Sequence, residues 1–174
     1  KGLSVPDVRV LIVNGRTCNR ARLPQSGYFK LRNKWTVPWL STTYGGWERQ
    51  PTQNELSEIL FDPSDLTSVC NIEDGEITVY HRWDTSTARV KSIDRANNIL
   101  TLATTANHPP GAFDTHDYVI WNVLEGMIEP GQWYYDMGRG KIIYWPLPGE
   151  DMSTAEIIVP NIDSIIQVKG TKTD

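Results

Sequence analysis

The chain has 174 residues and a formal net charge of −4, and its length fits one domain that can bury a sizeable core. The acidic balance and the absence of any Lys/Arg run argue against nucleic acid and anionic membranes as partners. The longest apolar runs, such as residues 10–13, have the length of a strand, so the sequence predicts no membrane insertion.

The first regular pattern is that of a β-hairpin. Residues 8–13 (VRVLIV) are rich in β-branched side chains and stop at Asn14-Gly15, a pair typical of a type I′ turn. We predict the return strand over residues 17–23, closed by Pro24.

A second strand is predicted over residues 76–83 (EITVYHRW), which alternate cleanly after the turn pair Asp74-Gly75. One face of this strand would carry Ile77, Val79, His81 and Trp83. Because His81 falls on this apolar face, we expect a packed histidine rather than a catalytic one. Further strands are predicted over residues 88–93, 99–104, 117–123, 155–159 and 164–168, and on both sides of residues 137–140.

Helical spacing is scarce in this sequence. It covers residues 53–60, and single turns are expected at residues 63–65, with Ser64 as N-cap, and at residues 123–127. Short strands separated by Gly, Asn and Asp turns dominate instead. The sequence therefore predicts an all-β fold, an antiparallel β-barrel or sandwich-like domain with one or two short helical turns.

The hairpin around residues 137–140 is strongly aromatic. Trp133 and Tyr135 alternate with Tyr134 on its first strand, and Tyr144 alternates with Trp145 on the second. Because neither face is polar, we expect both faces to be covered. The hairpin is then core rather than an exposed sugar-binding platform, and the side chains predicted to be mostly buried are Trp133, Tyr134, Tyr144 and Trp145.

Residues 25–55 form the least regular and most aromatic loop. Long irregular loops in compact domains are usually functional or mobile. Sugars stack their C–H faces on exposed aromatic rings, and periodicity assigns none of the aromatic residues here to a core. The candidate glycan-binding residues are therefore Trp35, Trp39, Tyr44, Trp47 and Arg49. Hydrogen-bond partners for hydroxyls or uronate carboxylates would be Arg32, Lys34 and Glu48.

No residue qualifies as catalytic from the sequence. Glycosidic hydrolysis needs two carboxylates held roughly 5 to 10 Å apart. The candidate pairs all lie in turn-like segments, where Asp favours capping of the backbone: Asp114 with Asp117, Asp62 with Asp65, and Glu73 with Asp74. A GxSxG nucleophile motif and a Gly-rich phosphate loop are both missing from the sequence.

The cysteines and histidines predict neither a metal site nor a cofactor. The chain has two Cys and three His, without a CxxC or HExxH motif, and zinc needs more ligands than these provide. His116 lies in a polar loop, where a metal role is the less favoured interpretation. Cys18 and Cys70 are expected to be free, buried thiols, with a disulfide between them as the alternative.

Residues 122–151 read NVLEGMIEPGQWYYDMGRGKIIYWPLPGED. This stretch resembles a segment of bacterial right-handed parallel β-helix proteins related to family-141 glycoside hydrolases. The family segment contains an EPGEWY motif, followed by an Asp, a Gly, a YYP motif and a GED motif. The matching residues here are Asn122, Leu124, Glu125, Glu129, Pro130, Gly131, Trp133, Tyr134, Asp136, Gly140, Tyr144, Pro146, Gly149, Glu150 and Asp151. A second family pattern is matched near the N-terminus by Val13, Asn14, Gly15, Ala21, Arg22 and Pro24.

In that family the unit resembles a β-barrel-like domain inserted between early rungs of the β-helix. The resemblance implies that residues 1–163 form an all-β insertion domain and residues 164–174 the first strand of a missing rung or a C-terminal tail. It also implies a longer parent protein, whose β-helix is a partner in the same polypeptide, and an extracytoplasmic location (periplasmic, cell-surface or secreted). The family's catalytic acids lie on the β-helix, so none is carried over to this chain.

Taken together, the sequence favours an accessory domain of a secreted carbohydrate-active protein that shapes or contacts a glycan cleft. We expect the domain to lack activity by itself and the parent to be a glycoside hydrolase. The alternatives are an autonomous carbohydrate-binding module, a purely structural scaffold, or a domain that contributes carboxylates such as Asp114 or Asp117 to the parent's hydrolysis. The expected ligand is an oligosaccharide or polysaccharide.

Overall fold

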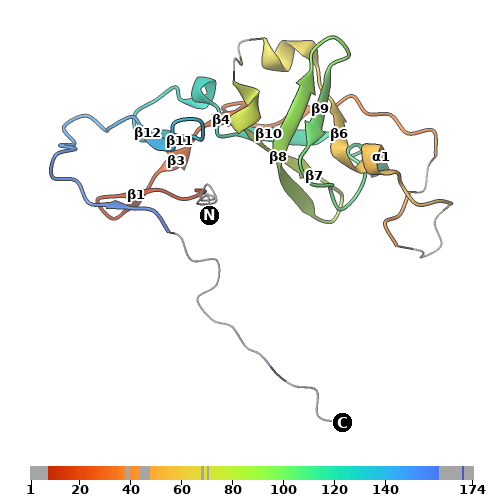
Figure 1. The fold of residues 1–174 in the computed structure, drawn as a ribbon, viewed down its shortest axis with the longest axis horizontal. Coiled ribbons are helices and arrows are strands. Elements are labelled where there is room, and N and C mark those ends of the chain that lie inside the picture. Colours follow the sequence, from red (N-terminus) through yellow and green to blue (C-terminus); the bar gives the residue numbers. More distant parts are fainter. Residues whose placement is uncertain are drawn as a thin grey trace.

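The computed structural model describes residues 8–37, 40–43, 48–67, 69, 71–160 and 170. These residues form an all-β domain with few and short helices (Figure 1), which confirms the predicted fold class. The strands are β1 (Ile12–Val13), β2 (Arg16–Thr17), β3 (Asn19–Arg20), β4 (Arg22–Leu23), β5 (Phe29–Lys30), β6 (Glu58–Leu60), β7 (Glu76–Tyr80), β8 (Thr85–Asp94), β9 (Ile99–Leu102), β10 (Asp117–Trp121), β11 (Gln132–Asp136), β12 (Lys141–Tyr144) and β13 (Ile157–Ile158). The helices are α1 (Gln53–Ser57) and the 3-10 turns η1 (Pro63–Leu66), η2 (Ile72–Asp74), η3 (Ala112–Asp114) and η4 (Leu124–Gly126).

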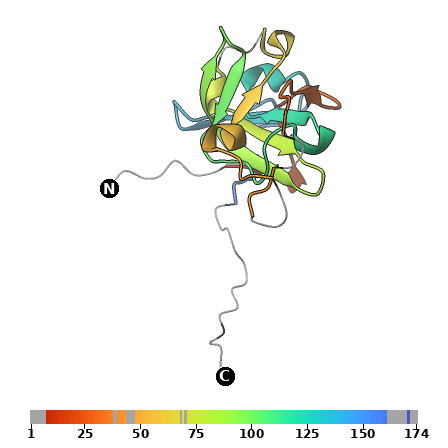
Figure 2. The same cartoon turned by 90° about the vertical axis from the view of Figure 1, so that its right-hand side faces the viewer.

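The largest sheet has seven strands in the order β4-β10-β7-β8-β9-β6, with β5 also paired to β10. All its pairings are antiparallel. Its apolar face is covered by the segment that carries η1 and η2, which contributes Leu66 and Ile72 to one core with Ile77 and Ile120. Seen from its right-hand side, the sheet and α1 face the viewer (Figure 2). The described strands do not close into a barrel, so the arrangement is the sandwich-like one of the two predicted.

Two three-stranded sheets form the other end of the molecule (Figure 1). One has the order β13-β1-β2 and the other β12-β11-β3, in which β11 and β3 run parallel. Their shared core surrounds Trp133, which is fully buried, and includes Leu11, Val13, Cys18 and Tyr135. Cys18 is a free thiol buried in this core, whereas Cys70 lies outside the described residues.

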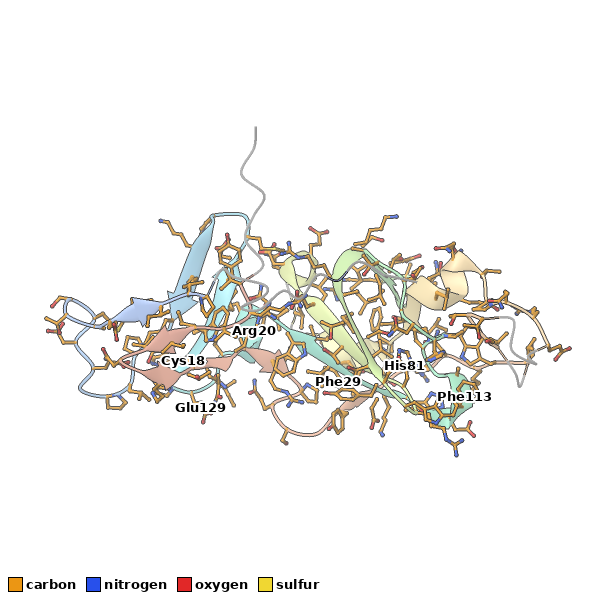
Figure 3. All side chains as sticks on the ribbon, turned by 90° about the horizontal axis from the view of Figure 1, so that it is seen from below. Cys18, Arg20, Phe29, His81, Phe113 and Glu129 are labelled. Carbon is orange, nitrogen blue, oxygen red and sulfur yellow. The ribbon has the colours of Figure 1, made fainter. Side chains whose placement is uncertain are left out.

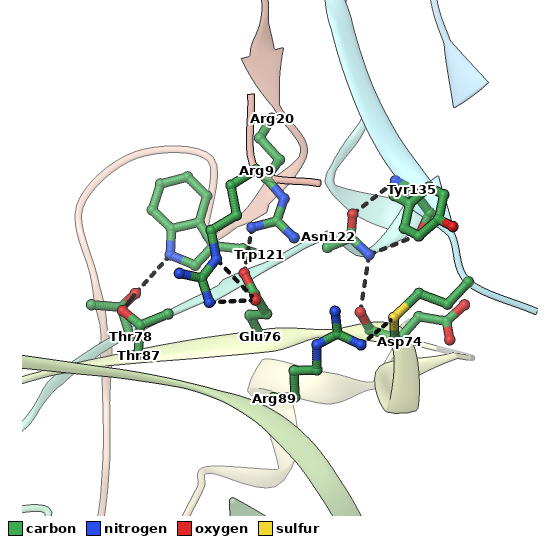
Figure 4. Close-up of polar contacts among 11 residues, drawn as sticks. Arg9, Arg20, Asp74, Glu76, Thr78, Thr87, Arg89, Trp121, Asn122 and Tyr135 are labelled. Atoms are coloured by element: carbon green, nitrogen blue, oxygen red, sulfur yellow. Dashed lines mark hydrogen bonds and ion pairs between the residues drawn. The ribbon is translucent and has the colours of Figure 1, made fainter. Parts of the chain in front are cut away.

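A buried charge network joins the two ends (Figure 4). The carboxylate of Glu76 on β7 is 3% exposed and accepts hydrogen bonds from Arg20 Nη1 at 2.5 Å and Arg9 Nη2 at 3.0 Å. The Arg20 guanidinium lies 5.8 Å from the centre of the Trp133 ring. Arg20 therefore contacts the small core with one part of its side chain and the large sheet with another.

The first predicted hairpin is present, but its return strand is divided. Asn14 and Gly15 both have positive φ (50° and 74°), which confirms the type I′ turn. Residues 16–23 then form three short pieces, because β2 pairs with β1, β3 with β11 and β4 with β10. One continuous strand is not formed because this segment crosses from sheet to sheet.

The predicted helical segments are only partly helical. Residues 53–57 form α1, but residues 58–60 form β6, which pairs with β9. The turn at residues 63–66 is present, yet its N-cap is Asp62 rather than Ser64, since the Asp62 side chain accepts from the Ser64 N–H. The turn predicted at residues 123–127 is confirmed as η4.

The burial predicted from sequence periodicity is wrong for two tryptophans, Trp83 and Trp145. Residues 76–80 form β7 as predicted, but the strand ends there, and Trp83 is 65% exposed instead of facing the core. In the aromatic hairpin Trp133 is buried as predicted, Tyr134 and Tyr144 are half-buried, and Trp145 is 44% exposed. The hairpin thus buries the Trp133 face, while Trp145 lies at the open end beyond β12.

Several residues of the family resemblance have clear structural roles here. Asn122, Gly131, Gly140 and Gly149 all have positive φ, between 62° and 89°, which glycine adopts without strain and asparagine tolerates. Tyr144 donates its hydroxyl hydrogen to Glu150 at 2.5 Å. The residues predicted to begin a β-helix rung, 164–168, lie outside the described residues, so the predicted boundary at residue 163 is untested.

Candidate functional site

A groove with a volume of about 940 Å³ lies between residues 30–37 with Leu40 on one side and residues 111–117 on the other. On the first wall Leu31 and Asn33 point inward and are buried, while Lys30, Arg32 and Lys34 are exposed. Alternation of this kind follows from the extended backbone, which sends successive side chains to opposite sides. The groove therefore has a row of cations along one rim.

The first wall is held by backbone pairing at both sides. The Leu31 N–H donates to the His116 carbonyl at 2.8 Å, and the Arg32 N–H donates to the Leu60 carbonyl at 2.6 Å. The Asn33 carboxamide adds two hydrogen bonds to β6, donating to the Glu58 carbonyl at 3.0 Å and accepting from the Leu60 N–H at 2.8 Å. The wall is therefore rigid although residues 31–37 belong to no sheet strand.

Trp35 is the aromatic residue of this wall. Its side chain is half-buried, and its indole N–H donates to the Pro110 carbonyl at 3.0 Å. Because this hydrogen bond crosses to the opposite wall, it fixes the orientation of the ring. Trp35 thus presents a held aromatic surface to the groove.

The opposite wall has a strained backbone. Gly111, Phe113 and Asp114 have φ values of 86°, 60° and 58°, a region that costs non-glycine residues roughly 1–2 kcal/mol each. A Cβ atom at Gly111 would lie 2.9 Å from the Leu31 Cδ1 atom, so the two walls approach too closely for any side chain there. Strain of this kind persists where surrounding contacts enforce it and clusters at functional sites.

The charges in the groove are partly paired. Lys30 forms a short ion pair with Asp117, and Arg32 lies 3.7 Å from Asp62. Lys34 and Asp114 have no ionic partner in the part of the chain that the structure describes. The groove therefore offers one cation and one carboxylate that are available to a polar ligand.

The structure places some of the predicted ligand residues in the groove and others away from it. Trp35 lies in the groove together with Arg32 and Lys34, as one cluster. Arg49 does not line the groove, because its guanidinium is bound to the Glu55 carboxylate. Its backbone forms a β-bridge with Leu40, and Leu40 does line the groove. Trp39, Tyr44 and Trp47 lie outside the described residues, so their predicted role is untested.

Two further aromatic residues were missed by the sequence reasoning. Phe113 lines the groove, and the exposed Trp83 contacts it edge to face with ring centres 5.0 Å apart. The signal that could have found Trp83 is the sequence His-Arg-Trp-Asp, three polar residues around one aromatic, which marks a turn better than a strand end. Figure 3 shows Phe113 and His81 at one end of the molecule, far from Cys18 and Glu129.

The histidines and carboxylates form no evident catalytic unit among the described residues. His81 Nε2 lies 2.9 Å from the Ser86 hydroxyl, but His81 is buried, and burial lowers the pKa of its imidazole. The Ser86 hydroxyl also accepts from the Asn107 N–H, so the pair serves to connect two loops. His81 is thus a packed histidine, as predicted.

The described residues show no grouping that would suit a metal ion. Within the described ranges no three His, Cys, Asp or Glu side chains are grouped so as to hold a metal ion. The Nδ1 atom of His116, in the groove wall, is buried and has no hydrogen-bond partner among the described atoms.

None of the described helices is long and apolar enough to cross a membrane.

A solved structure titled "Glycoside hydrolase" contains the same fold. The superposition has a TM-score of 0.61 at 23% sequence identity and covers 95% of this chain and 28% of that chain. The chain therefore spans less than a third of the length of that protein. No protein-family model matches the sequence, and no curated protein matches it. The likeness establishes a fold that occurs as one part of a glycoside hydrolase.

Proposed function

We propose that the chain is a non-catalytic accessory domain of a longer carbohydrate-active protein. We further propose that it contacts glycan through the groove between residues 30–37 with Leu40 and residues 111–117. The observation that carries this proposal is the groove itself, with a held indole ring beside unpaired polar groups. The likeness of the chain's fold to part of a glycoside hydrolase supports a role in carbohydrate binding.

The groove has the chemistry that sugars require. A pyranose ring has an apolar C–H face, which stacks on an aromatic ring such as that of Trp35, and a rim of hydroxyls. Lys34 would donate to these hydroxyls or to a uronate carboxylate, and Asp114 would accept from them. Because the domain offers one short wall of a cleft, we expect a weak affinity, about millimolar, which corresponds to roughly −4 kcal/mol.

Two carboxylates, Asp114 and Asp117, line the groove, and we propose no hydrolytic role for them in this chain alone. Asp117 forms an ion pair with Lys30, so its carboxylate is already engaged by a cation of this chain. Asp114 lies on the strained loop and is exposed, and no ion pair in the described residues fixes its carboxylate. A domain that supplies Asp114 alone would still need a second carboxylate from the parent protein.

The partner that we propose is the remainder of the same polypeptide, a right-handed β-helix, in an extracytoplasmic protein. Exposed apolar side chains at the end opposite the groove support such a docking role. Ile128 and Trp145 are 57% and 44% exposed, and both lie next to Gln132, to which their backbone N–H groups donate. These side chains also favour the second candidate function, a scaffold that makes no contact with glycan.

Chemical-shift mapping of the 174-residue chain with soluble oligosaccharides tests the proposal. The probes are oligosaccharides of xylan, cellulose and polygalacturonate. We expect shifts confined to the two groove walls, and their loss in Trp35→Ala and Lys34→Ala. Lys34 is exposed and has no ionic partner in the described residues, so its removal should leave the fold intact.

Trp145→Ala is the matched control, because it removes an exposed tryptophan at the far end of the molecule. It should leave the shifts unchanged. If no probe shifts a groove residue at concentrations well above millimolar, the scaffold is the better proposal. Chemical-shift changes that centre on Trp145 would contradict the proposal, because they would place the sugar contact at the end of the domain opposite the groove.

A further inference from the structure

Trp83 is the most exposed of the large apolar side chains in the described residues, at 65%. Its ring is nevertheless held in place. Phe113 contacts it edge to face at 5.0 Å, His108 lies at 6.3 Å, and the Arg82 guanidinium lies 5.8 Å from the ring centre. An exposed aromatic ring that is fixed in this way loses little conformational entropy when a ligand stacks on it.

The turn that carries Trp83 is also fixed. The His81 N–H donates to the Asp84 carbonyl at 2.9 Å, which closes the turn around Arg82 and Trp83. The Asp84 carboxylate accepts from the Asn107 carboxamide at 3.0 Å, which ties the turn to the next loop. The position of Trp83 is therefore determined by the fold and not by its own packing.

Trp83 adjoins the groove through Phe113. Phe113 lines the groove and contacts Trp83, and it does so from a left-handed backbone conformation with φ of 60°. A relaxed backbone at this position would direct the ring elsewhere. The strain of the loop thus contributes to an aromatic surface that continues from the groove to Trp83.

We propose that Trp83, supported by Phe113, forms a second sugar-stacking subsite that adjoins the groove. The ligand is an oligosaccharide that places one pyranose in the groove and a neighbouring pyranose on Trp83. Arg82 and Asn107, both exposed, would hydrogen-bond its hydroxyls. This inference rests on the proposed function, because it extends the same binding surface.

The competing occupant is another part of the parent protein. A buried protein contact would normally surround a tryptophan with apolar neighbours, since interface cores are depleted in charged residues. Trp83 instead lies between Arg82 and Asp84 in sequence, and next to His108 in space. These polar neighbours favour a sugar, whose hydroxyls require donors and acceptors.

The test measures affinity as a function of oligosaccharide length by calorimetry. Xylan and polygalacturonate oligosaccharides, from monosaccharide to hexasaccharide, are titrated into the 174-residue chain and into its Trp83→Ala variant. For the unaltered chain we expect an increase in affinity of about tenfold, or roughly 1.4 kcal/mol, once the ligand spans both subsites. Trp83→Ala should abolish that increase and leave monosaccharide binding in the groove unchanged.

Trp83→Phe and Trp145→Ala complete the design. The first keeps a smaller stacking surface and should retain part of the length dependence, and the second should retain all of it. Because Trp83 is largely exposed, thermal unfolding of the two Trp83 variants should match that of the unaltered chain. If Trp83→Ala keeps the full length dependence, the subsite is wrong while the groove proposal stands. If the unaltered chain binds no oligosaccharide, both are wrong.

Discussion

The carboxamide of Asn122 is hydrogen-bonded in both directions to the backbone of Tyr135. Its Nδ2 donates to the Tyr135 carbonyl at 2.8 Å, and its Oδ1 accepts from the Tyr135 N–H at 2.7 Å. The same Nδ2 donates to the Asp74 carbonyl at 2.9 Å (Figure 4). Since Asn122 directly follows β10 and Tyr135 lies on β11, one side chain connects the large sheet to the small ones.

Two substitutions at Asn122 should separate its two roles. Its φ is 64°, so Asn122→Gly removes the hydrogen bonds but keeps an unstrained backbone, while Asn122→Ala adds strain. We expect Asn122→Gly to lower the free energy of unfolding by at least about 2 kcal/mol, because buried backbone groups lose their partners. Asn122→Ala should cost roughly 1–2 kcal/mol more. Denaturant unfolding measures both, and equal costs would contradict the role of the backbone conformation.

Glu76 should be necessary for stability. Glu76→Gln removes the charge that pairs with Arg20, whose side chain is 12% exposed, and leaves this guanidinium largely buried without its anion. Removing one partner of a buried pair costs about 3–5 kcal/mol, and we expect a loss near 3 kcal/mol since the amide oxygen still accepts. Glu129→Gln, at an exposed position, is the control and should change stability by less than about 0.5 kcal/mol.

The two hairpin tryptophans should respond differently to truncation. Trp133 is fully buried and its indole N–H donates to the Cys18 carbonyl at 3.1 Å, so Trp133→Ala should cost about 3–5 kcal/mol. Trp145→Ala should cost about 1 kcal/mol or less, because Trp145 is partly exposed. Thermal unfolding of the two variants measures the difference in stability. A severe loss of stability in Trp145→Ala would instead support the fully buried hairpin that the sequence predicts.

The contribution of Glu55 to stability should depend on pH. Its hydrogen bonds with Arg49, and with the Thr52 N–H that it caps, lower the pKa of the Glu55 carboxyl from 4.5 to about 2. A lowered pKa in the folded state means that the stabilisation is present above pH 4.5 and is lost as the pH falls toward 2. The pair is partly exposed, so we expect Glu55→Gln to cost about 0.5–1 kcal/mol at pH 7.

Unfolding of both proteins across this pH range provides the measurement. The difference between the unaltered chain and Glu55→Gln should shrink steadily from pH 4.5 to pH 2. A difference that stays constant over this range would show that the charge of Glu55 does not matter. Glu48→Gln, at an exposed neighbouring position, controls for the general effect of removing one negative charge.

Local chemistry made some elements predictable. The Asn14-Gly15 turn follows from two residues that tolerate positive φ, and the turn between β8 and β9 follows from Asp94, which accepts from the Ala96 and Asn97 N–H groups. Alternation identified residues 76–80 as a strand. In each case the signal lies within a few residues, so the sequence contains all that is needed.

The candidate site was predicted only in part. The irregular composition of residues 25–55 marked Trp35, Arg32 and Lys34, and these do lie together in the groove. The opposite wall, which carries Phe113, is about eighty residues away in the chain. Nothing in the sequence indicates that Gly111 packs against Leu31, and Trp83 was assigned to a core because the alternation was extended past Tyr80.

By itself, then, the sequence determined the all-β class and its local turns, and it marked one of the two groove walls. Tertiary structure alone decided that residues 16–23 serve three different strand partners, that Glu76 is buried between two arginines, and that Trp83 is exposed beside Phe113. The physical reason is the separation in sequence between the residues that interact. Turn and strand preferences arise between neighbouring residues, whereas burial and groove formation depend on which distant segments the tertiary fold brings together.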